Sequence, residues 1–420
     1  MNVISKFFND MKELYKSYPK NIRITLLVLI ALVCGFGIFA IQILFWGLGY
    51  TDMNNVFTWG NWIIGDLGLV ALGGGAFFTG FFLYIFRVEK LEPIINSTVL
   101  IGFMCYLFTF VFLLFDLGQP LRCWFGFAYP NWGEHLMPTS MLTEVFFCLS
   151  AYFCILCVEL VPVALRHKFL DNVPVLHTIG HYMHKLMWIM AAAGTFLSFF
   201  HQGSLGGGMW DVLYGKPGWY RPHHQYFFLA IVAATAGGTS FMTLCPYIAG
   251  KIMKKEVMPK ETYWTLTKIS GAMFIFYTLF RTYDVYSMAA KYVPMADRKF
   301  TDIYGGYYGL WLVVLEFIFL AAPVVLLNLK KFREQEKFMA IGISGGVLAI
   351  ITSKLEVMLH GFSVPNFPWR PFAAYNPTFQ EWIITLGCFA TMILIYTVFA
   401  KWFRLFPHLD HEGHGEGEAH

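Results

Sequence analysis

The chain has 420 residues, of which 57% are hydrophobic, 19% aromatic and only 13% charged, whereas about 25% are charged in an average soluble protein. The net charge of +4 is small, which excludes a nucleic-acid-binding protein, and the 8 cysteines are scattered through apolar runs, which excludes a disulfide-stapled secreted scaffold. The composition predicts a polytopic membrane protein. We expect no cleavable signal peptide, because no small-residue cleavage site follows the charged first twenty residues.

Ten stretches are long and apolar enough to cross a bilayer, which takes about 20 residues. In chain order they are 22–48, 59–86, 98–117, 138–165, 183–207, 223–249, 263–290, 304–329, 337–361 and 379–404. Their length and continuous apolarity favour helices over the alternating strands of a membrane barrel. The sequence therefore predicts an all-α integral membrane fold of ten transmembrane helices, with a short segment at 1–21 before them and a tail rich in His, Gly and Glu at 405–420.

The distribution of basic residues predicts how these helices are oriented. Twenty of the 30 Lys and Arg residues fall in the segments on the side of the N-terminus, seven fall in the opposite loops, and three lie within spans. Cytoplasmic segments carry such an excess. We therefore expect both termini in the cytoplasm and a protein that crosses the membrane several times.

Ionisable residues within the spans gather toward the outer ends of the helices. Such groups cost several kcal/mol in hydrocarbon unless they are paired or hydrated, so each one suggests a function. Asp66, Asp116, Glu144 and His201 come from four consecutive spans at similar depth. The pattern predicts a protonatable chamber that opens toward the outer face. The residues expected to transfer protons are Asp66, Glu144, Glu316 and Glu356.

Some of these groups have a purely structural interpretation. Arg281 and Asp284 are three residues apart and can form an ion pair on one helix, and such pairs can simply hold helices together. Only His201 and His360 lie inside spans, so a haem with two histidine ligands is not expected, and no cysteine spacing suits an iron–sulfur cluster. We expect no haem, iron–sulfur cluster or metal site in this chain, so any electrons would come from a partner.

Four motifs together resemble one protein family. Phe115-Asp116-Leu117-Gly118-Gln119-Pro120 resembles the "FDLGRP" signature of the polysulfide-reductase membrane-subunit family, called NrfD-like, and the other three motifs follow in the expected order. They are Met141 to Val145 beside "SVMFEV", His201 to Gly206 beside "HQSSLG", and Gln380-Glu381-Trp382 with Leu386-Gly387 beside "WxEIxxxLG". Gln119 replaces the usual Arg, and Arg122 lies nearby as another cation.

The resemblance to the longer, ten-helix branch implies a particular architecture and activity. That branch is represented by membrane subunits of periplasmic nickel–iron hydrogenases and of sulfate-reducer redox complexes. It implies two four-helix bundles at 59–207 and 223–361, formed by helices 2–5 and 6–9, flanked by helix 1 at 22–48 and helix 10 at 379–404. It also implies electron exchange with a quinone near the outer face, through an iron–sulfur subunit docked there.

The resulting hypothesis is a quinone-reactive membrane subunit of a respiratory oxidoreductase in the bacterial inner membrane. We expect the quinone, with menaquinone favoured, to bind at His201, Asp116, Arg122, Trp62 and His135. Asp116 would orient the imidazole of His201. The implied partner is a periplasmic ferredoxin-like subunit that leads to a hydrogenase, a molybdopterin enzyme or a multihaem cytochrome, alongside membrane lipid and without nucleic acid.

Two other functions remain open on the sequence alone. An ion- or proton-coupled secondary transporter would use the membrane-embedded charges, including Lys354, as its ion path. A non-catalytic membrane anchor for periplasmic enzymes would need no ligand site, but it would have no reason to bear the cost of buried carboxylates.

Overall fold

The computed structural model describes residues 12, 13, 16, 19–128, 132–133, 141–165, 174–213, 215–216, 223–403 and 405–406. Within these ranges the secondary structure is helical and contains no strand. Eight described helical stretches are long and apolar enough to cross a membrane: Lys20–Tyr50, Ile64–Tyr84, Glu89–Asp116, Thr143–Ala164, Gln225–Met253, Leu310–Leu327, Glu336–Ser363 and Phe379–Lys401. The predicted all-helical, multi-pass membrane fold is confirmed at this level.

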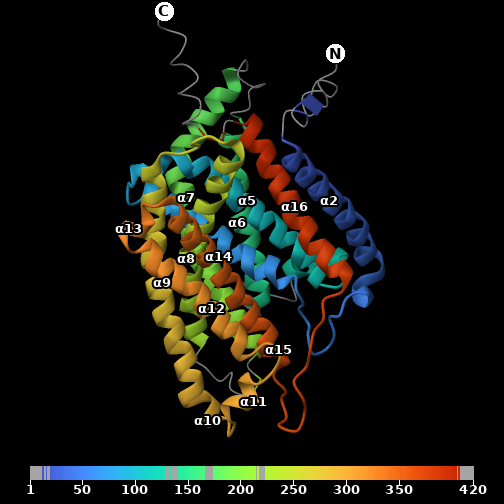
Figure 1. Cartoon of the computed structure of the whole chain (residues 1–420). Coiled ribbons are helices and arrows are strands. Elements are labelled where there is room, and N and C mark those ends of the chain that lie inside the picture. Colours follow the sequence, from blue (N-terminus) through green and yellow to red (C-terminus); the bar gives the residue numbers. More distant parts are fainter. Residues whose placement is uncertain are drawn as a thin grey trace, which may run out of the picture.

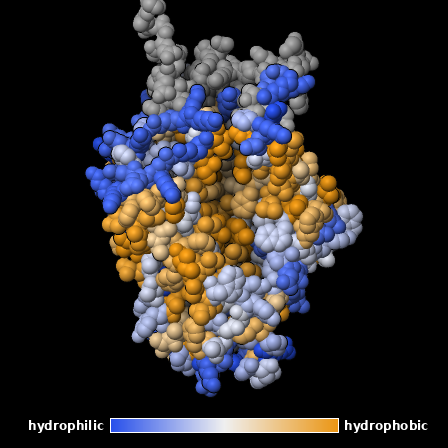
Figure 2. All heavy atoms as spheres, viewed as in Figure 1, coloured by the Kyte–Doolittle hydropathy of each residue, from blue (hydrophilic) through white to orange (hydrophobic). Residues whose placement is uncertain are grey.

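The exposed surface is apolar where lipid is expected. Figure 2 shows a belt of hydrophobic side chains between a strongly hydrophilic end and an opposite end where hydrophilic residues return. On one flank, α2 (Lys20–Trp46) packs against α16 (Phe379–Trp402), and α2 begins at the end of the molecule where α16 finishes. Large side chains of α2 such as Ile38 are mostly exposed. Because nothing covers this apolar face within the described chain, α2 is suited to face lipid.

The remaining helices form the body of the molecule (Figure 1). In chain order they are η1 (Gly47–Tyr50), η2 (Ile64–Leu69), α3 (Val70–Gly73), α4 (Gly75–Tyr84), η3 (Glu89–Ile94), α5 (Ile95–Asp116), η4 (Pro120–Phe127), α6 (Met141–Ala164), α7 (Pro174–Leu213), α8 (His223–Met253), α9 (Lys260–Ser287), η8 (Met288–Tyr292), α10 (Val293–Met295), α11 (Phe300–Tyr304), α12 (Leu310–Ala322), η9 (Pro323–Leu327), α13 (Lys330–Arg333), α14 (Glu336–Leu355), η10 (Glu356–His360) and α15 (Gly361–Ser363).

Helices α7 and α9 are also long, with 40 and 28 residues, and both pack against α8. Helix α7 extends beyond the predicted range 183–207 at both ends, and it begins at Pro174. Proline suits the first turn of a helix, because its fixed φ angle is helical and its missing N–H would have no partner there. In chain order, α7 lies between the spans Thr143–Ala164 and Gln225–Met253, and α9 lies between Gln225–Met253 and Leu310–Leu327.

Helices α4 and α8 cross in close contact. A Cβ atom placed on Gly75 would lie 2.6 Å from the Cα of Gly238, closer than real Cβ atoms approach a backbone. Gly73 is equally restricted by Cys105, at 2.7 Å. Small residues let membrane helices approach this closely, so these glycines serve helix packing.

Candidate functional site

Asp66 lies in a π-helical turn. The segment η2 (Ile64–Leu69) contains it, and the residue is only 6% exposed. Trp62, one turn earlier, is fully buried; its ring lies 5.5 Å from that of Phe115 and its indole N–H donates to the carbonyl of Glu381 at 3.4 Å. A π-helical turn widens a helix locally and is frequent at functional sites. Here it directs a carboxyl group toward α5.

Asp116 is the last residue of α5, and its carboxyl group is buried. Its carboxyl group lies within hydrogen-bonding reach of the carboxyl group of Asp66, and the charge of Glu381 also acts on it; apart from Asp66, its oxygen atoms have no hydrogen-bond partner among the described residues. The C-terminal end of a helix carries partial negative charge, so a bare carboxylate there is electrostatically unfavourable. Since no described cation compensates it, Asp116 is suited to receive a proton or a hydrogen-bond donor.

A cavity of about 750 Å³ begins immediately beyond Asp116. It lies between the end of α2 and η4, and its lining residues are Leu48, Leu117, Gly118, Gln119, Arg122, Trp124 and Phe125. Gly118 has a φ angle of +64°, a conformation that other residues rarely adopt, and it turns the chain sharply at the end of α5. The cavity falls within the 300–1,000 Å³ usual for small-molecule sites. Its walls are mostly apolar and aromatic, and the exposed Arg122 adds a positive charge.

His201 lies on α7 and is fully buried, yet neither ring nitrogen has a hydrogen-bond partner. The rings of Tyr106 and Tyr152 each lie 6.2 Å from the imidazole, centroid to centroid. The hydroxyl of Tyr152 is also buried here, within hydrogen-bonding reach of the hydroxyls of Ser198 and Tyr106. Buried polar atoms without a partner, such as the ring nitrogens of His201, are rare in native structures and each calls for an explanation. Asp116 makes no hydrogen bond to this imidazole, so its expected orienting role is not seen in this structure.

Glu144 lies on α6 and is half-buried. It accepts a hydrogen bond of 2.5 Å from the hydroxyl of Ser204 on α7. The bond ties the beginning of α6 to the segment that follows His201. Glu144 therefore borders the same part of the fold as His201, but in the described part of the chain no hydrogen bond joins it to Asp66 or Asp116.

A network around Glu381 was not expected from the sequence. The fully buried Glu381 accepts hydrogen bonds from the hydroxyl of Tyr375, from the backbone N–H of Asp52 at 3.0 Å and from that of Thr378 at 2.8 Å. Burial and the bond to Glu381 raise the pKa of Tyr375 above its ordinary value, so the phenol stays a donor. The capping-box spacing from Thr378 to Glu381 was the one sequence signal for this network.

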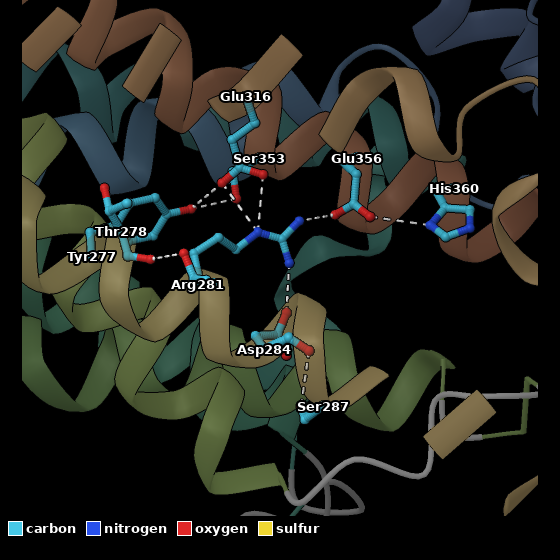
Figure 3. Close-up of polar contacts among 10 residues, drawn as sticks. Tyr277, Thr278, Arg281, Asp284, Ser287, Glu316, Ser353, Glu356 and His360 are labelled. Atoms are coloured by element: carbon cyan, nitrogen blue, oxygen red, sulfur yellow. Dashed lines mark hydrogen bonds and ion pairs between the residues drawn. The ribbon is translucent and has the colours of Figure 1, made fainter. Parts of the chain in front are cut away.

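The second charged site surrounds Arg281 (Figure 3). The guanidinium is 1% exposed; its Nη1 donates to Asp284 at 2.6 Å, its Nη2 to Glu356 at 2.8 Å, and its Nε to Glu316 at 3.0 Å. The pairing with Asp284 follows the expected three-residue spacing. The two other carboxylates come from α12 and η10. Two of the residues predicted to transfer protons are therefore ion-pair partners of Arg281.

Tyr277 and His360 extend this cluster. The hydroxyl of Tyr277 lies 2.7 Å from Glu316 Oε1 and 2.8 Å from Ser353 Oγ, so it donates to the carboxylate and accepts from the serine. The Nε2 of His360 lies 2.8 Å from the carbonyl oxygen of Ile303 and must carry a hydrogen, while its Nδ1 lies 3.2 Å from Glu356 Oε1. His360 therefore contacts the same carboxyl group that binds Arg281.

The structure separates the described site residues that were predicted into three groups. Trp62, Asp66 and Asp116 lie together, with Arg122 exposed at the cavity beyond them. His201 and Glu144 belong to the neighbouring helices α7 and α6, and the Arg281 cluster is a separate site. His135 lies outside the described residues. Among the described side chains, no group of three or more His, Cys, Asp or Glu residues is arranged to hold a metal ion.

The fold and these sites define a multi-pass helical membrane protein with buried acids and histidines grouped between its helices. The model of the polysulphide reductase, NrfD family matches residues 49–366, and the chain belongs to this family. The predicted family membership is confirmed.

Three relatives align over nearly their whole length. The integral membrane subunit of menaquinone reductase from Nitratidesulfovibrio vulgaris is 32% identical over 381 residues, 89% of each chain. A probable Ni/Fe-hydrogenase 2 b-type cytochrome subunit from Escherichia coli is 24% identical, covering 90% of this chain and 91% of its own. The integral membrane subunit of an Hdr-like menaquinol oxidoreductase from Archaeoglobus fulgidus is 21% identical, covering 91% and 93%.

Proposed function

We propose that this chain is the quinone-reactive membrane subunit of a multisubunit oxidoreductase, with menaquinone as its quinone. The names of two relatives, a menaquinone reductase subunit and a menaquinol oxidoreductase subunit, support this function. The quinone head would enter the cavity beyond α5 and react beside Asp116.

The observation that carries this proposal is the buried acid pair of Asp116 and Asp66, which has no cation beside it among the described residues and directly precedes Leu117 and Gly118 in the cavity wall. Reduction of a quinone takes two electrons and two protons, so the ring needs a proton exchanger at its oxygen atoms. The carboxyl group of Asp116 can accept a hydrogen bond from a quinol hydroxyl or deliver a proton to a quinone oxygen. Asp66, whose charge interacts with that of Asp116, is placed to share that proton.

The other polar groups of the first half have distinct roles in this proposal. His201 has both ring nitrogens available and would relay the second proton. Glu144, held by Ser204, would exchange protons with His201. Two residues would orient the quinone ring: Arg122, in the cavity wall, and Trp62, which packs against Phe115 beside Asp116. His135 remains a proposed ligand from the sequence.

The proposed topology completes the membrane subunit. Helices α7 and α9 would join the eight apolar stretches as spans, giving ten helices arranged as two four-helix bundles with α2 and α16 beside them. Both termini would lie in the cytoplasm of a bacterial inner membrane. The periplasmic face, near the cavity, would receive an iron–sulfur subunit, which passes electrons to or from a hydrogenase, molybdopterin enzyme or multihaem cytochrome.

The structure gives the transporter alternative little support. Gly74, which separates α3 from α4, keeps helical backbone angles, with a φ of −54° and a ψ of −25°. Gly75 is explained by its contact with Gly238. Inverted-repeat transporters instead use interrupted helices to build their sites.

The test is quinone-linked turnover of the complex purified with its own partners. Asp116→Asn and His201→Gln should lower turnover at least tenfold while the complex still assembles, since each change removes a proton exchanger. Asp297→Asn removes an exposed carboxylate and serves as the matched control with unchanged turnover. Normal turnover in both site variants would contradict the proposal.

A further inference from the structure

The second half of the chain repeats the first half at a set of glycine, phenylalanine and polar positions. Residues 59–213 form the first half and residues 223–363 the second. Eleven residues recur in the same order on the four corresponding helices. The pairs are Gly73 and Gly237, Gly74 and Gly238, Phe77 and Phe241, Thr79 and Thr243, Phe108 and Phe276, Phe112 and Phe280, Asp116 and Asp284, Glu144 and Glu316, Phe147 and Phe319, His201 and His360, and Ser204 and Ser363.

The structure places these repeated residues in comparable positions. Asp116 stands at the end of α5, as Asp284 stands in the last turn of α9. The repeated pair Gly74 and Gly238 lies where the first helix of each half meets the other: a Cβ on Gly74 would lie 3.6 Å from Ala234 of α8, and one on Gly238 would lie 2.4 Å from the backbone of Gly75. An acid, a second acid and a histidine thus recur on the second, third and fourth helix of each half.

The two sets differ at several charged positions, and Arg281 is the residue that joins the acids of the second set. In the alignment that pairs Asp116 with Asp284, Arg281 of the second half corresponds to Leu113 of the first. Arg281 brings Asp284 and Glu316 together by hydrogen bonds of 2.6 Å and 3.0 Å. Leu113 is a partly buried residue of the apolar core and brings no charge.

The corresponding residues of the first half, Asp116, Glu144 and His201, therefore have no guanidinium to join them in the described part of the chain. Without a cation, Asp116 has only the carboxyl group of Asp66 as a side-chain partner among the described residues, and both ring nitrogens of His201 have none there. Glu144 turns to Ser204 instead. Buried polar groups without partners are costly, so a ligand with hydrogen-bond donors and acceptors would stabilise this set as Arg281 stabilises the other.

We propose that the Arg281 cluster is a second copy of the quinone site, closed by its own guanidinium, and that Leu113 keeps the first copy open. This inference rests on the proposed function. A quinol O–H would donate to Asp116 as the guanidinium N–H donates to Asp284. Quinone binding is therefore confined to one of two related sites, and an arginine at position 113 would close the first site as well.

The test uses the complex with its native partners and a fluorescent quinol analogue, heptyl-hydroxyquinoline N-oxide, whose emission is quenched on binding. The native chain should bind one analogue. Leu113→Arg should weaken that binding at least tenfold, because the new guanidinium can pair with Asp116 three residues away. Leu279→Arg makes the same change at a residue of α9 that is 63% exposed, and it should bind like the native chain.

The outcomes separate this inference from the proposed function. Two analogues bound per native chain would overturn the inference and leave the function standing. Unchanged binding by an assembled Leu113→Arg variant would do the same. If that variant does not assemble, Leu113→Gln carries a neutral donor to the same position, and its unchanged affinity would overturn the inference. No binding to the native chain would instead refute the proposed function.

Discussion

Replacing Arg281 by Met should strongly destabilise the fold. The change removes four hydrogen bonds from a guanidinium that is 1% exposed and leaves Asp284, Glu316 and Glu356 without their shared cation. Removing one partner of a buried ion pair costs about 3–5 kcal/mol. Because every 1.4 kcal/mol is a tenfold change, that cost lowers the ratio of folded to unfolded protein by about 140-fold to 3,700-fold. Lys354, the other buried cation near Glu316, is not hydrogen-bonded to these carboxylates in the described contacts.

The assay is thermal unfolding of the purified protein in detergent, followed by size-exclusion chromatography. Arg281→Met should lower the melting temperature or prevent recovery of folded protein. Adding Glu316→Gln removes one uncompensated charge and should restore about 0.5–3 kcal/mol. Arg298→Met loses only one exposed hydrogen bond, of 3.3 Å to the carbonyl of Asn366, and serves as the control. A melting temperature of Arg281→Met equal to that of the control would refute the reasoning.

Two further substitutions test packing and proton transfer. Gly75→Ala should cost about 1–3 kcal/mol in unfolding free energy, because its methyl group would meet Gly238; the control Gly37→Ala meets nothing within 4 Å and should be neutral or stabilising in the same thermal assay. Equal stability of the two variants would contradict the close crossing. Glu144→Gln keeps an acceptor for Ser204 but cannot release a proton, so quinone-linked turnover should fall while assembly is retained. Native turnover of this variant would exclude Glu144 from the proton path.

Local sequence spacing predicted some of the second site but not its centre. The pairing of Arg281 with Asp284 follows from their separation on one helix. Glu316 and Glu356 are 35 and 75 residues from Arg281, and their contacts depend on how α9, α12 and α14 pack. The spacing of residues along one helix does not show which residues of the other helices lie at the same depth and face it.

The first site shows the same limit. Composition and apolar length predicted the membrane helices and marked Asp66, Asp116 and His201 as unusual. The role of Glu381 in binding Tyr375 was missed, because Tyr375 lies in a loop whose path depends on the packing of α16. The absence of any hydrogen bond to His201 is likewise a property of the packed structure.

The most direct test of the central claim is to map where a photoactivatable azidoquinone attaches to this chain in the native complex. After illumination and digestion, mass spectrometry should find the label on peptides from the end of α5 and from η4, and an excess of unmodified menaquinone should remove it. Labelling confined to α9, α12 or α14, or labelling that excess menaquinone does not reduce, would contradict a quinone site beside Asp116.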